Sequence, residues 1–133
     1  MQTTVRDTLK LKITNTNQGE VLMNQRLITG LKSAEKLLLK WGVTHEQIQV
    51  ILPTEENNLE VRISHLLNIH AALRTIFSNE DNVYGFMSRT NNNTFFNGRS
   101  PISIIASGRL SDLEEVRDKI DSLVLRCDSH TES

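Results

Sequence analysis

The sequence predicts an all-α protein folded as a compact multi-helix bundle. Apolar residues between positions 31 and 41 recur at steps of three and four, which places them on one face of a helix. A second series, between positions 63 and 77, keeps this spacing over a longer stretch. Several segments begin with a residue that favours the start of a helix and end with one that favours its end, most clearly positions 100–108. A chain of 133 residues can bury one such core without a metal or a disulfide.

Residues 1–19 are the least regular part of the sequence. Leu9, Leu11 and Ile13 alternate with lysines, which is typical of a strand, but a lone strand without a partner is unstable in water. We therefore expect a flexible N-terminal arm or an edge segment here.

Residues 20–78 carry the pattern of a helical part. The first helical stretch ends at a glycine after Trp41, and Gly30 is a candidate break that would divide it into two helices. Thr44 and Gln47 are the two ends of a capping box, which begins a second helix. Pro53 closes that helix because the residue before a proline disfavours the α conformation.

A long helix is expected next, capped by Asn57 or Asn58. Its apolar seam has a four-three-four-three spacing, which is typical of a bundle core or of an interface between two chains. The seam residues are Ile63, Leu66, His70, Leu73 and Phe77. We expect this seam to hold a homodimer together, although a monomer core has the same pattern. His65 and His70 are five residues apart, unlike a pair of metal ligands, so we expect His70 to be a hydrogen-bonded core or interface histidine.

The helix–glycine–helix step over residues 31–52 has the outline of the first two helices of a helix-turn-helix DNA reader. Such a motif needs a following recognition helix, whereas residues 54–58 are short, acidic and free of Lys and Arg. Base-specific DNA binding is therefore disfavoured. Lys32, Lys36 and Lys40 share one helix face and could contact phosphate, or they could be the solvated side of an amphipathic helix.

In residues 96–108 the signals for the start and the end of a helix lie closer together than elsewhere in the chain. Ser100 can cap the first free N–H groups of a short helix, and Pro101 stands where its missing N–H has no cost. Gly108 can end that helix in the left-handed conformation. Arg99 lies just before the helix, where it could hold an anion or could pin the loop to a nearby carboxylate or carbonyl group.

The last helix is expected to open at a capping box formed by Ser111 and Glu114 and to run to about Arg126. Residues 127–133 then form a polar tail. A short helix is also expected after Ser78 or Asn79, followed by a polar turn at residues 91–94.

The sequence lacks the constellations of an enzyme. No nucleophile stands beside a plausible base, and no phosphate-binding glycine loop or cysteine–histidine cluster occurs, so we expect no catalytic residue, metal or cofactor. The single cysteine, Cys127, cannot form an internal disulfide, which favours a reducing compartment. No apolar run is long enough for a membrane span or a signal peptide, so a cytoplasmic protein is expected.

Charge is unevenly distributed along the chain. Residues 1–50 carry seven Lys and Arg against four Asp and Glu, whereas residues 111–133 carry three against seven. The acidic end is either a contact surface for a basic partner or the solvated face of a helix.

The sequence resembles the Xre/MbcA/ParS-like antitoxin family of bacteria. The resemblance rests on residues 34–42, on residues 62–74, and above all on Asn97, Gly98, Arg99, Ser100 and Pro101 with the Ala-Ser-Gly stop at 106–108. It implies an antitoxin that binds a cognate toxin encoded beside it, either a RES-type enzyme that degrades NAD or an ADP-ribosyltransferase. It further implies an Xre-like part over residues 20–78, here without a clear recognition helix, and a toxin-binding domain over residues 79–126.

A mechanism follows from this resemblance as a hypothesis. The C-terminal helix pair would cover the active-site cleft of the toxin, which should be basic because NAD carries a pyrophosphate group. Asp118, together with the motif around Arg99, would then contact the toxin. The alternatives are a small helix-turn-helix-like transcriptional regulator and a homodimeric adaptor without a toxin.

Overall fold

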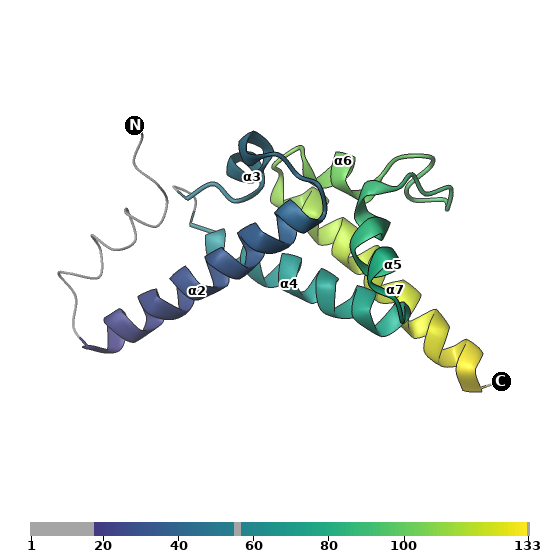
Figure 1. The fold of residues 1–133 in the computed structure, drawn as a ribbon, viewed down its shortest axis with the longest axis horizontal. Helices are drawn as coiled ribbons and strands as arrows, with labels where there is room; N and C mark the ends of the chain where they lie inside the picture. Colours follow the sequence, from purple (N-terminus) through teal and green to yellow (C-terminus); the bar gives the residue numbers. More distant parts are fainter. Residues whose placement is uncertain (1–17, 55–56, 133) are drawn as a thin grey trace.

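The computed structural model describes residues 18–54 and 57–132, with side chains for residues 24–54 and 57–126. Its described part is all-α, as the sequence predicted (Figure 1). The elements are α2 (Gln18–Lys40), α3 (His45–Ile51), α4 (Leu59–Ile76), α5 (Glu80–Gly85), the 3-10 turn η1 (Phe86–Ser88), α6 (Pro101–Ile105) and α7 (Leu110–Glu132). Within these ranges, the one pairing of extended backbone is an isolated bridge between Asn91 and Arg99.

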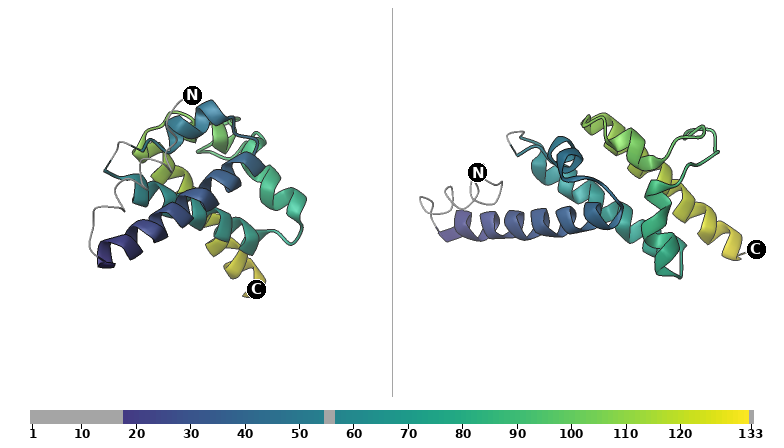
Figure 2. Two further views of the ribbon diagram at one scale, coloured as in Figure 1. Left: turned by 60° about the vertical axis from the view of Figure 1, so that its left-hand side comes forward. Right: turned by 45° about the horizontal axis from the view of Figure 1, so that its top comes forward.

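Helix α4 is the central element of the bundle. It packs most extensively against α7 and also contacts α2 and α5 (Figures 1 and 2). Leu66, Ile69 and Leu73 are completely buried in these contacts. The N-terminal end of α2 and the C-terminal end of α7 project from opposite ends of the packed region. A continuous core between three helices follows from the three-and-four spacing of their apolar residues.

The seam of α4 belongs mainly to the core of a single chain, so its placement in a dimer interface was wrong. Ile63, Leu66 and Leu73 are at most 5% exposed and pack inside the bundle, while His70 and Phe77 are half-buried. Side chains that are already buried inside the chain cannot also cover a second chain. Homodimerisation itself stays a prediction, but it would need another surface.

Helix α2 is continuous, and the expected break at Gly30 is absent. A Cβ atom at this position would stand 3.3 Å from Cγ2 of Ile63 on α4. The absence of a side chain at Gly30 therefore allows α2 and α4 to cross closely. This close crossing accounts for a glycine at this position although the helix does not bend there.

The ends of α3 and α6 agree with the sequence signals. The Thr44 side chain accepts the Gln47 N–H and the Gln47 side chain accepts the Thr44 N–H, at 3.1 and 3.0 Å, which is the expected capping box. At α6 the Ser100 hydroxyl accepts the N–H of Ser103, and Pro101 occupies the first turn. Gly108 follows with a φ of +81°. The ends of these two helices were predicted correctly because each cap joins groups that are close in sequence.

Helix α7 differs from its expected limits at both ends. It begins at Leu110, so Ser111 lies inside it and does not form a capping box. Ser107 is used instead: its hydroxyl accepts the Arg109 N–H at 3.1 Å and donates to Asp112 at 2.6 Å. At the other end the backbone stays helical to Glu132, where a polar tail was expected. The expected arm lies outside the described residues, except that residues 18 and 19 already belong to α2.

Between Leu52 and Leu59 the described residues form turns and no helix, as expected for a missing recognition helix. Asn58 precedes α4, but its side chain accepts a bond from Arg62 and does not cap the helix. Arg62 is buried and also donates to the carbonyl of Ile51, which ties the end of α3 to α4. In the described part of the chain no helix is both long and apolar enough to cross a bilayer.

Candidate functional site

The motif that carried the resemblance is a rigid turn. Asn97 and Gly98 both have positive φ angles, of 50° and 82°, and the Arg99 N–H donates to the Phe96 carbonyl at 2.9 Å. Two consecutive left-handed residues closed by such a bond are typical of a type I′ turn, for which Asn-Gly is the favoured pair. The sequence therefore contained the signal for this turn, although only a loop was inferred from it.

Two phenylalanines before the turn have different surroundings. Phe96 is completely buried and contacts the ring of Phe86 edge-on at 6.4 Å between centroids. Phe95 is half-buried, and the cationic groups of Arg99 and Lys119 lie 5.7 and 5.4 Å from its ring centroid. Phe96 thus anchors the loop in the core, while Phe95 connects it to α7 through cation–π contacts.

Arg99 pins the loop. Its Nε donates to the Phe96 carbonyl at 2.9 Å and a terminal nitrogen donates to the Phe95 carbonyl at 2.8 Å. Of the two roles that the sequence left open for Arg99, the structure therefore supports loop pinning by carbonyl groups. The side chain stays exposed, so its remaining N–H groups face solvent beside the motif.

The structure groups five of the predicted contact residues and separates the sixth. Asn97, Gly98 and Arg99 form the exposed turn, and Ser100 and Pro101 follow at the start of α6. Lys119 of α7 is the residue that reaches the loop. Asp118 is exposed and its charge acts on His65 of α4, so it lies toward the α4 side of α7 and not under the motif.

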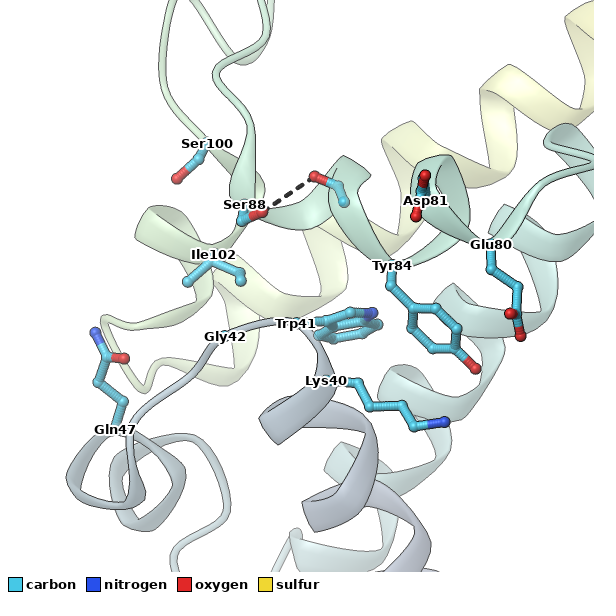
Figure 3. A pocket seen from close by; sticks show the side chains of 11 residues that line it. Lys40, Trp41, Gly42, Gln47, Glu80, Asp81, Tyr84, Ser88, Ser100 and Ile102 are labelled. Carbon is cyan, nitrogen blue, oxygen red and sulfur yellow. Dashed lines mark hydrogen bonds between the residues drawn. The ribbon is translucent and has the colours of Figure 1, made fainter.

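A groove of about 800 Å³ opens beside the motif, between the end of α2, α5 and the start of α6 (Figure 3). Ser100 and Ile102 join it to the motif. Its lining also includes Lys40, Trp41, Gly42, Gln47, Glu80, Asp81, Tyr84, Gly85 and Ser88. The groove brings together residues up to 62 positions apart in the sequence, which no local pattern could indicate.

Tyr84 is the central side chain of this groove, which we call the Tyr84 groove. Its ring stacks on that of His70 at 5.4 Å between centroids, and the ammonium group of Lys40 lies 4.9 Å from the ring centroid. Trp41 lines the same groove, and in the view of Figure 3 its indole nitrogen is on the side where Tyr84 is drawn. Tyr84 therefore contacts the aromatic ring of His70 and the cationic group of Lys40.

Two buried nitrogens next to Tyr84 lack hydrogen-bond partners among the described residues. They are Nε1 of Trp41, whose side chain belongs to a residue that is 1% exposed, and Nδ1 of His70. The expectation that His70 is hydrogen-bonded is thus not met at this nitrogen. Burial, followed by the positive charges of Arg74 and Lys40, lowers the pKa of His70, so the imidazole is neutral at pH 7.

A separate polar cluster joins α4 to α7. Nδ1 of His65 is 3.0 Å from a terminal nitrogen of Arg117, which can only donate, so His65 accepts there and carries its proton on Nε2. Nε2 is 3.8 Å from Glu114, too far for a hydrogen bond. Burial and then the charge of Arg117 lower the pKa of His65, although Glu114, Asp118 and Asp121 oppose this shift.

The lysines proposed for DNA contact are all exposed on α2. Lys32 and Lys36 form no hydrogen bond or ion pair with another described residue, whereas Lys40 lies over Tyr84 and so belongs to the groove. Within the described residues, no group of three or more His, Cys, Asp or Glu side chains could hold a metal ion.

Comparison with known proteins gives one partial match. An uncharacterized protein, y4oB, from Sinorhizobium fredii (strain NBRC 101917 / NGR234) is 36% identical to this chain over 61 residues. The match covers 46% of this chain and 46% of the relative, so it spans less than half of each. No family model and no solved structure matches the chain.

Proposed function

We propose that this chain is the antitoxin of a type II toxin–antitoxin pair and that it covers the active-site cleft of a RES-type or ADP-ribosyltransferase toxin. The proposal rests on the resemblance of residues 97–101 to the antitoxin motif. The observation that carries it is the preformed geometry of that motif. Because hydrogen bonds and the buried Phe96 already fix the turn, little conformational entropy would be lost when a partner binds.

The charges around the motif suggest how a partner would dock. Arg99 and Lys119 place positive charge beside the turn, while Glu114, Glu115 and Asp118 are exposed elsewhere on α7. The toxin surface should therefore be acidic opposite the turn and basic opposite the exposed carboxylates of α7. Such a two-sign pattern fixes orientation and speeds encounter more than it adds affinity.

The test is co-expression with the product of the neighbouring reading frame, followed by co-purification and assays of NAD consumption and of ADP-ribosylation. The proposal expects a stable complex in which the partner's activity is suppressed. Absence of a complex, together with normal growth of cells that express the neighbour alone, would refute it.

Substitutions locate the interface within that experiment. Arg99→Ala should weaken neutralisation because it removes an exposed charge and two bonds that pin the turn. Asp118→Asn tests the exposed carboxylates of α7. Arg74→Ala is the control, since Arg74 is also an exposed arginine, on α4, yet lies outside the motif and outside the lining of the Tyr84 groove. If Arg99→Ala and Asp118→Asn both neutralise fully at unchanged helicity, this interface is wrong.

A second candidate is a DNA-binding regulator, favoured by the exposure of Lys32 and Lys36 on one face of α2. A gel shift with the upstream promoter at two salt concentrations tests it. Specific binding would survive competitor DNA, whereas binding by charge alone would disappear as salt rises.

A further inference from the structure

We infer that the Tyr84 groove is a receptor for an arginine or lysine side chain, presented on an extended segment of the partner protein. This inference rests on the proposed function for the identity of the partner, and it adds the chemistry by which the partner is held. The groove adjoins the motif through Ser100 and Ile102, so one partner could contact both.

The first reason is unpaired negative charge. Glu80 and Asp81 line the groove, are exposed, and form no ion pair in the described structure. The lining side chains carry two negative charges against the one positive charge of Lys40, while Arg89, which donates to the Asp81 carbonyl, adjoins the groove outside its lining.

The second reason is the unpartnered N–H of Trp41. This residue lines the groove and is 1% exposed, and its Nε1 finds no acceptor among the described residues. A buried donor without an acceptor is costly, and a peptide carbonyl would satisfy it. The carboxylates of Glu80 and Asp81 can pair with a cationic side chain, and the indole N–H of Trp41 can donate to a peptide carbonyl. A basic residue within a peptide offers both groups.

The third reason is the position of Lys40, which occupies the cation site that a ligand would use. Its ammonium lies over the Tyr84 ring without forming an ion pair in the described structure. An arginine of the partner could stack on Tyr84 and bond to Glu80 or Asp81 at once, so it should displace Lys40. Nε1 of Trp41 is covered in the unliganded chain, so a peptide carbonyl would reach it only after side chains around the groove move.

The chain provides its own probe for this inference. Trp41 is the single tryptophan, so its indole N–H gives one cross-peak in a ¹H–¹⁵N spectrum of the full chain. The titrant is a short capped Gly/Ser peptide with one central arginine, and the same peptide with glutamate or leucine in its place is the comparison. We expect a saturable downfield shift of the Trp41 indole proton with the arginine peptide, and none with the other two.

Two variants make the result specific. Glu80→Gln with Asp81→Asn should weaken binding of the arginine peptide about tenfold, as expected for loss of charge-assisted bonds. Glu60→Gln with Glu115→Gln, at exposed carboxylates outside the lining, should leave binding unchanged. Lys40→Ala should strengthen binding, since it removes a competing cation. Weaker binding on Lys40→Ala, a response to the glutamate peptide, or no saturable response to the arginine peptide would each overturn the inference.

The outcomes separate this inference from the toxin proposal. If the arginine peptide binds but the neighbouring gene product forms no complex, the groove chemistry stands and the proposed function fails. If a complex forms with full affinity for the Glu80→Gln, Asp81→Asn variant and the peptide does not bind, the proposed function stands and the groove inference fails.

Discussion

Phe96 should be the most sensitive residue of the motif loop, and replacement by alanine measures how firmly the loop is held. Its side chain is completely buried and contacts the rings of Phe86 and Phe95 edge-on, at 6.4 and 5.0 Å between centroids. Replacing a buried phenylalanine by alanine costs about 3–5 kcal/mol, because apolar contact is lost and a cavity remains. Each lost aromatic pair adds about 0.5–1.5 kcal/mol to the burial term, so we expect a value near the top of that range.

The loss would be a large part of the total stability, which for a domain is about 5–15 kcal/mol. Phe95→Ala is the matched control, because it removes the same Phe95–Phe96 pair from a half-buried ring whose lost burial should cost only about 1–2 kcal/mol. Urea unfolding followed by the fluorescence of Trp41, which is buried, measures both variants in the full chain. If Phe96→Ala costs no more than Phe95→Ala, Phe96 does not anchor the loop in the core and the rigid-turn argument fails.

Two further predictions concern the joints between helices. Gly108→Ala should destabilise the fold by more than the ~1–2 kcal/mol that an alanine in the left-handed conformation costs. The reason is that φ is +81° and that the new Cβ would also stand 2.7 Å from Cγ1 and 3.1 Å from the carbonyl oxygen of Val50. A urea midpoint like that of the parent would contradict this prediction. His65 has a pKa below its usual value of 6.5 in the folded chain, so the unfolded chain binds more protons between the lowered pKa and 6.5. Its contribution to stability is therefore complete above about pH 6.5 and is lost as pH falls through the lowered pKa. Urea midpoints across this range should rise with pH, and His65→Gln should reduce the slope but leave the part due to His70, whose pKa is also lowered. An equal slope in His65→Gln would show that the bond to Arg117 does not couple to protonation.

Local signals in the sequence were sufficient for much of the fold. We predicted correctly the capping box at Thr44 and Gln47 and the start and end signals of α6 from Ser100 to Gly108. Each of these depends on groups within a few residues of one another. Gly30 was misread for the opposite reason. Gly30 leaves room for the side chain of Ile63 on α4, and the local sequence around Gly30 does not reveal this contact.

The candidate site divides in the same way. The turn at Asn97 and Gly98 carries its own signal, the Asn-Gly pair. The Tyr84 groove carries none, because it assembles Trp41 from one helix with Glu80 and Tyr84 from another. The sequence placed Lys40 correctly on the exposed face of α2, but the contact with Tyr84 needed the fold.

By itself the sequence determined that this protein is helical and where most helices begin and end, since helix propensity, apolar periodicity and capping act over one or two turns. Only the tertiary structure decided what those helices bury. It placed Ile63, Leu66 and Leu73 in the core of a single chain, and it left Nε1 of Trp41 without an acceptor beside the carboxylates of the groove. Burial and hydrogen-bond satisfaction depend on residues that meet only when distant segments pack, and the spacing of side chains along one helix does not specify its partner.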